Sequence, residues 1–318
     1  MKVLVMGAGA IGSVFGGLLA KAGSEVSLVG RGRYMSAVER NGLMLSGIFG
    51  EHHVTNLKTF TKVSQIKDRD FDLILITTKA FDTEEAVKEV LPLVGVKTLV
   101  ISLQNGLGNL EAIARLAGEE HAVGGRVIFG VEMPEVGHAK VTVFGDKVLL
   151  GSPSGKIPLE RIAEVARLFT EAGIPTEATT EINHYLWGKI LYNSCLNALS
   201  AILGSNYGVL GKIPETREIM AEVVSEIFAV AKGEGVKLGF ANPADYLSLF
   251  YSRLLPATAA HHSSMLQDVR QGRKTEIDAM NGIIVKLGEK HGIETPVNRL
   301  LTRLVHAREK LPANPPQG

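Results

Sequence analysis

Short hydrophobic runs alternate with amphipathic segments along the first 180 positions of the chain. Four of these runs predict buried β-strands, at 2–6, 25–29, 73–78 and 98–102. Helical periodicity lies between and after them, near 11–22, 34–41, 82–91 and 107–116. Because strands that alternate with helices form parallel sheets through right-handed crossovers, the pattern predicts a Rossmann-type, doubly wound α/β domain.

The pattern changes between 122 and 151. Shorter strands with turns at Pro134, Gly137 and Gly145-Asp146 are expected there, as an antiparallel extension of the sheet. A helix at 158–172 and a short strand near 175–178 follow. We place the end of this α/β domain at residue 179.

From residue 180 onward strand patterns largely disappear. Helical periodicity recurs at 181–203, 215–231, 244–254, 275–289 and 296–309. Glycine or proline interrupts the chain between these segments. The sequence therefore predicts an all-helical domain over 180–318, and the polar residues considered below lead us to expect the substrate and catalytic groups there. Its proline-rich tail, at 312–316, is expected to be disordered.

A glycine-rich turn follows the first strand directly. Its sequence is Gly7-Ala8-Gly9-Ala10-Ile11-Gly12. Gly7 would permit the tight turn, Gly9 would let the backbone approach a pyrophosphate, and Gly12 would let the helix pack close to the sheet. The helix that begins around Ala10 and Ile11 would direct its free N–H groups at the phosphates. The context favours a dinucleotide site over a purely structural strand–turn–helix.

The end of the second strand indicates which dinucleotide is bound. An NAD-preferring site usually places Asp or Glu there to bind the ribose 2′-hydroxyl. This chain has Gly30 followed by Arg31, with Arg33 close behind. A guanidinium can bind a 2′-phosphate that an acid would repel. The sequence therefore favours NADPH over NADH; the alternative is that both arginines lie in a solvated loop.

Composition excludes several other classes of protein. The 318 residues carry a formal net charge of +1 and 6% aromatic residues, without the basic patch of a nucleic-acid-binding protein. Cys195 is the single cysteine, so neither an intrachain disulfide nor a cysteine-based zinc site is expected. His261-His262 has no third ligand at a suitable spacing, and no metal is expected. No segment is predicted to span a membrane, and we expect a cytoplasmic protein.

One helix of the second half carries a polar face among apolar neighbours. Lys189, Asn193 and Asn197 are four residues apart and therefore share one side of the predicted helix. Asparagine is a poor helix former, so two of them beside a lysine indicate a polar site. An exposed lysine with two structural amides is the alternative. A lysine ammonium can attract a carboxylate and donate a proton to a developing alkoxide.

At these residues the chain resembles the ketopantoate reductase family, from the glycine loop to about residue 290. Three blocks carry the resemblance: the Lys189–Asn193–Asn197 helix, the run Ser102-Leu103-Gln104-Asn105-Gly106, and Ser263-Ser264-Met265-Leu266-Gln267-Asp268 followed by Thr275-Glu276-Ile277-Asp278. The resemblance implies NADPH-dependent reduction of 2-dehydropantoate to D-pantoate.

The resemblance also implies roles on the substrate side. Lys189 matches the family's general acid, and Glu276 matches a glutamate that hydrogen-bonds the substrate near the reacting oxygen. Asn193, Asn197 and Ser264 match the residues that bind the substrate carboxylate and hydroxyl.

On the cofactor side, Arg31 matches the 2′-phosphate ligand. Lys79 matches a lysine close to cofactor and substrate, and Asn105 matches the asparagine at the junction of the two. Asp82 stands where some members carry glutamine, and we interpret it as a cap of the following helix.

Two other functions stay open at this point. One is reduction of a different branched 2-oxo acid, because the lysine, asparagine and glutamate set does not define the substrate's side group. The other is a non-catalytic protein that senses NADP(H), although the presence of Lys189 and Glu276 argues against it. Apolar helical faces in the second half also allow a homodimer.

Overall fold

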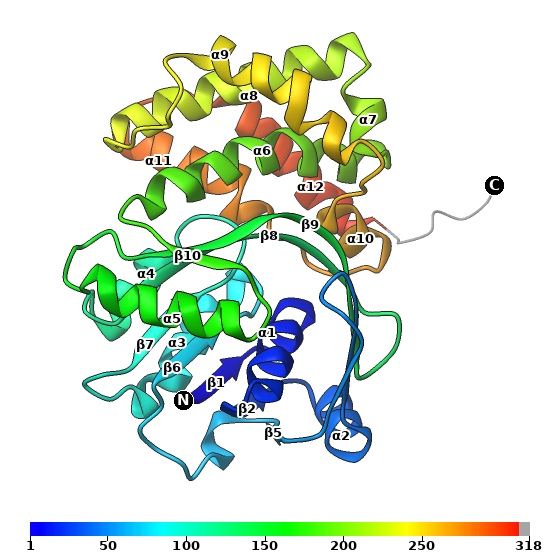
Figure 1. The fold of residues 1–318 in the computed structure, drawn as a ribbon. Helices are drawn as coiled ribbons and strands as arrows, with labels where there is room; N and C mark the ends of the chain where they lie inside the picture. The colour runs from blue at the N-terminus through cyan, green and yellow to red at the C-terminus, as the bar shows by residue number, and fades with distance from the viewer. Residues whose placement is uncertain (312–318) are drawn as a thin grey trace. The chain divides into compact units, whose positions relative to one another are not determined.

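The computed structural model describes residues 1–311, and the chain forms two compact units. Unit 1 comprises Met1–Ile182, and unit 2 begins at Asn183. All strands of the described chain belong to unit 1, and the described part of unit 2 is helical (Figure 1). The predicted combination of an α/β domain and an all-helical domain is therefore confirmed. The predicted disordered tail lies outside the described residues.

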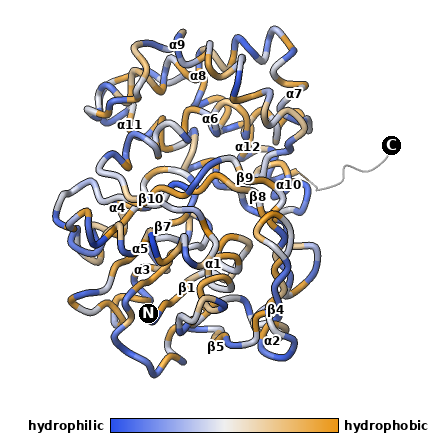
Figure 2. The backbone as a smooth tube through the Cα atoms, viewed as in Figure 1, coloured by the Kyte–Doolittle hydropathy of each residue, from blue (hydrophilic) through white to orange (hydrophobic). Residues whose placement is uncertain are grey.

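Unit 1 is built around a ten-stranded sheet. The order is β4-β3-β9-β8-β7-β6-β1-β2-β5, and β10 pairs with β9. The strands are β1 Lys2–Met6, β2 Glu25–Val29, β3 Leu43–Gly47, β4 His52–Val54, β5 Leu57–Phe60, β6 Leu73–Ile76, β7 Leu99–Ser102, β8 Ala122–Glu132, β9 His138–Gly151 and β10 Thr176–Ala178. Strands β7, β6, β1, β2 and β5 run parallel, so their carboxyl ends share one edge. Figure 2 shows β1, β6 and β7 as hydrophobic, and all but one of their residues are buried.

Strands β8 and β9 form the expected antiparallel extension. The predicted turn at Gly145-Asp146 is wrong, because both residues lie inside β9. The register between the two strands shifts close to Ile128, and a Cβ atom on Gly145 would lie 2.8 Å from Cγ2 of Ile128. This glycine therefore marks an irregularity of the ladder, where the strand bends without reversing.

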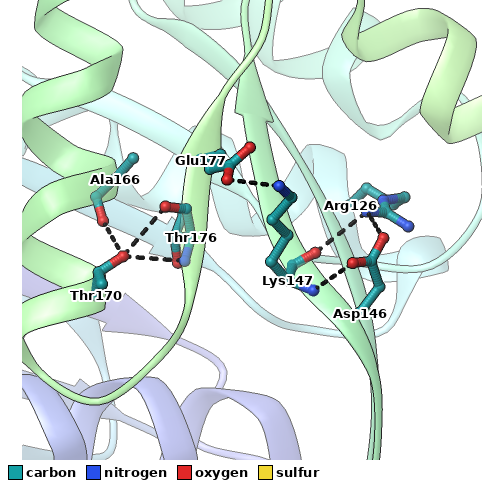
Figure 3. Close-up of polar contacts among 7 residues, drawn as sticks. All are labelled: Arg126, Asp146, Lys147, Ala166, Thr170, Thr176 and Glu177. Carbon is teal, nitrogen blue, oxygen red and sulfur yellow. Dashed lines mark hydrogen bonds and ion pairs between the residues drawn. The ribbon is translucent and has the colours of Figure 1, made fainter.

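Ion pairs link the three strands on this side of the sheet (Figure 3). On β8, Arg126 donates to Asp146 Oδ2 on β9 at 2.7 Å, and its side chain is 8% exposed. Lys147 Nζ, next along β9, lies 2.5 Å from Glu177 Oε1 on β10. Burial opposes ionisation of Asp146, but the guanidinium outweighs it and lowers the pKa of this carboxyl. The pairs thus add side-chain contacts between strands whose backbones are already paired.

Five helices of unit 1 pack against the sheet. They are α1 Ala10–Lys21, α2 Gly32–Asn41, α3 Thr83–Val90, α4 Asn109–Ala117 and α5 Leu159–Glu171, with 3₁₀ turns η1 Val63–Gln65, η2 Ala80–Asp82 and η3 Leu91–Leu93. Phe15 of α1 meets Phe169 of α5 edge to face, with ring centroids 5.3 Å apart. The α3 and α4 pair packs together beside β6 and β7.

Unit 2 begins within the longest helix, α6 Ile182–Leu203. The others are α7 Tyr207–Leu210, α8 Pro214–Gly233, α9 Pro243–Leu249, α10 Ser264–Arg270, α11 Asn281–His291 and α12 Pro296–Lys310, with short turns η4 Phe250–Leu254, η5 Pro256–Thr258 and η6 Ile277–Ala279. Proline at the first position of α8, α9 and α12 fits a helix start. The polar side of α6 near Asn193 and Asn197 is buried too, so this helix lies inside the core of the unit.

The predicted single helix over 275–289 is wrong at its beginning. Residues 277–279 form the 3₁₀ turn η6, and α11 begins only at Asn281. Met280, between them, has φ −113° and ψ −98°, which lies outside the helical region. Glu276 therefore lies before a short turn and outside any regular helix, a position that helical periodicity does not predict.

Candidate functional site

The glycine loop adopts the predicted strand–turn–helix form in unit 1. Gly7 has φ +107°, which disfavours any side chain, and a Cβ atom there would lie 2.6 Å from the Thr78 backbone nitrogen. A Cβ atom on Gly12 would lie 2.4 Å from the Gly7 carbonyl oxygen. The N–H groups of Gly7 and Ala8 donate to the Val29 carbonyl, which ties the loop to the end of β2. The protein's own packing therefore explains Gly7 and Gly12.

Gly9 differs from both of these glycines. It has φ −88° and ψ −158°, an extended conformation that other residues adopt, and it is exposed. A Cβ atom on Gly9 would meet only the Gly7 carbonyl oxygen, at 4.0 Å. Helix α1, which starts after Gly9, has no side-chain cap and no acidic residue in its first turn. The open space and the uncapped N–H groups together suit a phosphate group.

Arg31 occupies the end of β2 as the N-cap residue of α2. Its backbone is extended, and α2 has neither a side-chain cap nor an acidic residue in its first turn. Arg31 and Arg33 are exposed, and within residues 1–311 neither guanidinium forms an ion pair. The start of α2 is held to α1 by a hydrogen bond of 2.9 Å between the hydroxyls of Tyr34 and Ser13. Two cations therefore lie at a fixed helix start.

Lys79 and Asn105 follow two neighbouring strands of the parallel sheet. Lys79 precedes η2 after β6, and Asn105 lies in the loop after β7. In the pairing of β6 with β7, Ile76 is opposite Ser102, so both loops leave the same edge of the sheet side by side. The carboxyl edge of a parallel sheet is where ligands bind in open α/β folds.

A third residue, Gln104, braces these two loops and was not assigned a role from the sequence. Its amide nitrogen donates to the Thr78 carbonyl at 3.0 Å and to the Thr83 hydroxyl at 2.7 Å. Its carbonyl oxygen accepts a hydrogen bond from the Ser102 hydroxyl at 3.1 Å. Gln104 belongs to one of the family-like blocks, but sequence alone does not reveal that its side chain turns inward.

Helix α6 of unit 2 presents the predicted polar row. Lys189 is half-buried, whereas Asn193 is 9% exposed and Asn197 is 4% exposed. Of the described residues, none forms a hydrogen bond with the side chain of Asn193. The Asn193 amide atoms still reach solvent, where water or a ligand can bond to them. Asn193 is therefore suited to bind a polar ligand.

Asn197, in contrast, is already bonded. Its Oδ1 accepts a hydrogen bond from the Tyr207 hydroxyl at 2.6 Å, and its Nδ2 donates toward the Met280 sulfur at 3.4 Å. Burial raises the pKa of Tyr207 far above its usual range, so this hydroxyl remains a donor. Sulfur is a weak acceptor. The Nδ2 atom of Asn197 is therefore the part of its amide that could serve a ligand.

The two serines before α10 have different surroundings. Ser263 is fully buried, and its hydroxyl accepts the Leu266 N–H at 2.9 Å as an N-cap. Ser264 is exposed, and its hydroxyl has no hydrogen-bond partner within the described part of the chain. Of the two, Ser264 is the one whose hydroxyl is available to a ligand, and the buried cap holds it in place.

Glu276 is 6% exposed and lies in a segment anchored on both sides. On one side, the Thr275 N–H donates to Glu309 of α12 at 2.7 Å. On the other, the Asn281 amide donates to the Ser194 carbonyl of α6 at 3.1 Å. The segment that carries Glu276 is therefore fastened to α12 and to the helix that carries Lys189.

Other candidate residues have structural surroundings. Asp82 stands at the N-cap position of α3, but its side chain makes no cap hydrogen bond, so that interpretation is wrong. The His261 ring lies edge to face with Tyr207. Across residues 1–311, no group of three or more His, Cys, Asp or Glu side chains could hold a metal ion. In the same part of the chain, no helix is both long and apolar enough to cross a membrane.

Comparison with protein families covers both units. A model described as "Ketopantoate reductase PanE/ApbA" matches residues 3–155, and one described as "Ketopantoate reductase PanE/ApbA C terminal" matches residues 181–309. The 2-dehydropantoate 2-reductase of Aquifex aeolicus is 43% identical over 97% of each chain. The enzyme of the same name from Pyrococcus horikoshii is 38% identical over 98% of each chain.

Solved structures give the same result. A PanE/ApbA family ketopantoate reductase from Ralstonia eutropha JMP134 superposes with a TM-score of 0.86 at 35% identity, covering 97% of this chain and 98% of that one. A D-mandelate dehydrogenase in complex with NADH and anilino(oxo)acetate superposes with a TM-score of 0.87 at 30% identity, with the same coverage. The fold thus occurs in enzymes that are named for different substrates.

Proposed function

Because the chain belongs to the ketopantoate reductase family, we propose that it reduces 2-dehydropantoate to D-pantoate with NADPH, a step toward pantothenate. The two relatives from Aquifex aeolicus and Pyrococcus horikoshii are named 2-dehydropantoate 2-reductase, and this chain matches them over nearly their whole length. The residues that such a reaction needs are present in this chain: a dinucleotide loop in unit 1, and a lysine, amides and a carboxyl group in unit 2.

The glycine loop fits a dinucleotide. Gly9 leaves space beside uncapped N–H groups of α1, where a pyrophosphate would be stabilised by the positive end of the helix. Ala10 and Ile11 would contribute backbone N–H groups there. Bound NADPH would supply the hydride that reduces the substrate carbonyl.

NADPH is favoured over NADH by the end of β2. Arg31 lies there without a neighbouring acid in the first turn of α2. A guanidinium pairs well with a phosphate monoester, and the aligned N–H groups of the helix start add to that attraction. The D-mandelate dehydrogenase relative was solved with NADH, and the affinities of an Arg31→Ala variant for NADPH and NADH test the choice of cofactor.

Lys189 is the proposed general acid. Its ammonium would donate a proton to the carbonyl oxygen as negative charge develops on it, and the charge would stabilise the alkoxide-like transition state more than the ketone. Glu276, from the anchored segment that follows α10, would hydrogen-bond the substrate near this oxygen. Its negative charge would also favour the charged form of a nearby lysine.

The side chains that have no partner among residues 1–311 would bind the substrate's other polar groups. The Asn193 amide and the Ser264 hydroxyl would bind its carboxylate and hydroxyl. Asn197 would contribute only through Nδ2, since Tyr207 occupies its oxygen. Asn105 and Lys79 of unit 1 would contact the cofactor beside the substrate.

The observation that carries this proposal is the row of Lys189, Asn193 and Asn197 on a buried helix, in which Asn193 has no described partner. The test is NADPH oxidation with ketopantoate and a panel of other 2-oxo acids. We expect ketopantoate to give the highest kcat/KM. If an aryl or another branched 2-oxo acid ranks first, the chain serves that substrate instead. If no 2-oxo acid is turned over although NADPH binds, the chain is a non-catalytic NADP(H) sensor.

A further inference from the structure

A buried hydrogen-bond network connects the two loops that carry Lys79 and Asn105. Three side chains form it: Gln104, Thr83 and Asn109, which are 7%, 3% and 5% exposed. None of them belongs to the residues that the proposed function uses. All three lie in unit 1.

The hydrogen bonds of this network lead from one loop to the other. Gln104 donates from its amide nitrogen to the Thr78 carbonyl and to the Thr83 hydroxyl. The Thr83 hydroxyl has one proton and two acceptors within reach, Asn109 Oδ1 at 2.7 Å and the Ala80 carbonyl at 2.9 Å. Asn109 Nδ2 in turn donates to the Asn105 carbonyl at 2.9 Å. Each contact is short enough to be a good hydrogen bond.

At both ends of this network the acceptor is a backbone carbonyl in an irregular segment. Thr78 directly precedes Lys79, and its loop has left β6 but has not yet entered η2. The Asn105 loop turns through Gly106 and Gly108, with φ +89° and +91°, before α4 begins. Glycine gives a loop conformational freedom, so regular structure alone does not fix the distance between the two loops.

We propose that Thr83, Gln104 and Asn109 are positioning residues, which hold the Lys79 and Asn105 loops in the arrangement that NADPH and the ketone require. The proposal rests on the proposed function, which assigns Lys79 and Asn105 to the cofactor. A buried hydrogen-bond network favours one arrangement of a core, because the loss of one hydrogen bond leaves the neighbouring polar group unsatisfied. A displacement of about 1 Å at a reacting group can cost about 100-fold in rate.

Thr83→Val tests the proposal, because it keeps the shape of the side chain and removes the hydroxyl. We expect kcat/KM for ketopantoate to fall by about tenfold or more and the NADPH dissociation constant to rise. Thr83→Ser restores the hydroxyl and should recover most of the loss. Thr98→Val is the matched control: this threonine is 2% exposed and donates to the Phe71 carbonyl at 2.6 Å, at the other end of β7. It should lose stability without the kinetic effect.

A double-mutant cycle separates positioning from stability. If the hydrogen-bond network acts through Asn105, Thr83→Val should change kcat/KM less than twofold in an Asn105→Ala background. The effects of the two substitutions on kcat/KM should then not multiply. Effects that multiply in both the Asn105→Ala and the Lys79→Ala backgrounds would overturn the proposal. So would a Thr83→Val enzyme with unchanged kinetics and only lower stability.

The single variant Asn105→Ala distinguishes a failure of the proposed function from a failure of the positioning proposal. If Asn105→Ala alone leaves both NADPH binding and turnover unchanged, the assignment of Asn105 is wrong, and the positioning proposal falls with it. Gln104→Met removes a different hydrogen bond of the network. It provides a second variant in case Thr83→Val does not fold. It should show the same loss and the same dependence on Asn105.

Discussion

The Tyr207 hydroxyl donates to Oδ1 of Asn197 across 2.6 Å in the core of unit 2. Both residues are 4% exposed, so water cannot readily replace either partner. The bond therefore fixes which way the Asn197 amide faces, with Nδ2 on the side of Met280.

Tyr207→Phe should disturb both stability and substrate binding. Removing the donor leaves a buried carbonyl oxygen unsatisfied, which costs about 1–3 kcal/mol. We expect the free energy of unfolding in urea to fall by that amount and KM for ketopantoate to rise as the amide loses its orientation. Tyr251→Phe is the control, since its hydroxyl makes only long contacts, with the Arg217 carbonyl at 3.4 Å and the Met220 sulfur at 3.7 Å. Equal effects of the two variants would contradict this prediction.

Lys189→Ala should abolish most of the turnover and leave cofactor binding intact. Loss of a general acid costs about 10²–10⁴-fold in rate, so kcat should fall at least about 100-fold. NADPH binding, measured by fluorescence titration, should change little because the glycine loop belongs to unit 1. Lys310→Ala, at an exposed position in α12, is the control. Wild-type turnover in the Lys189 variant would remove the proposed mechanism.

Arg31→Ala should change the choice of cofactor. Hydrogen bonds to a charged group contribute about 1.5–3 kcal/mol, so NADPH should bind at least about tenfold more weakly. NADH lacks the 2′-phosphate and should bind with nearly the same affinity as before. Arg40→Ala, in the last turn of the same helix, should leave both affinities unchanged. If NADPH and NADH weaken equally, Arg31 does not meet the 2′-phosphate.

Gly9→Ala and Gly12→Ala should separate ligand binding from packing. The new methyl group at residue 9 has open space, whereas at residue 12 it would lie 2.4 Å from a backbone oxygen. We expect Gly9→Ala to reduce stability by less than about 1 kcal/mol and to weaken NADPH strongly. Gly12→Ala should lower stability by about 1–3 kcal/mol. Calorimetry and NADPH titration of both variants test this, and a Gly9→Ala enzyme with normal NADPH affinity would contradict it.

His306 should make the stability of unit 2 depend on pH. Its ring lies 2.9 Å from Asp278 Oδ1 and 3.1 Å from Glu309 Oε2. Burial lowers the pKa of His306, but the bonds to these carboxylates outweigh it, so the pKa is raised above its ordinary value. The protonated ring therefore stabilises the fold fully below the unfolded pKa of about 6.5, and this contribution is lost as pH rises through the folded pKa.

The measurement compares the wild-type protein with His306→Gln in urea from about pH 6 to about pH 9, on either side of the ordinary histidine pKa. The difference in unfolding free energy should be largest at the acidic end and shrink as pH rises. His53→Gln is the control, because His53 is exposed and bonds only to the Asn41 carbonyl. A difference that grows with pH would show that the pKa of His306 is lowered.

Much of the fold could be predicted because the parallel strands and long helices have strong hydrophobic patterns. The strand of residues 2–6 and the helix around Lys189 were clear for this reason. The turn at Gly145-Asp146 was wrong because a glycine inside a bulged strand has the same local sequence as a hairpin. Glu276 was assigned to a helix because the backbone break at Met280 depends on packing against α6 and α12, which the local sequence does not encode.

The candidate site was predictable to a similar extent. The glycine loop and the polar row on α6 follow from spacing, because each lies within one continuous segment. The bond from Tyr207 to Asn197 and the inward side chain of Gln104 join segments that the sequence separates, so spacing could not indicate them. The contrast between Ser263 and Ser264 was equally hidden, since it depends on which hydroxyl caps α10.

The position of β3 in the sheet has a consequence during protein synthesis. β3 pairs with β9, and Met44 is opposite His138. When the hairpin of β3 and β4 leaves the ribosome, the strand that will cover its inner edge has not been translated. Unpaired strand edges readily associate with other chains. The nascent polypeptide therefore exposes this edge until the segment that pairs with it, residues 138–141, has emerged.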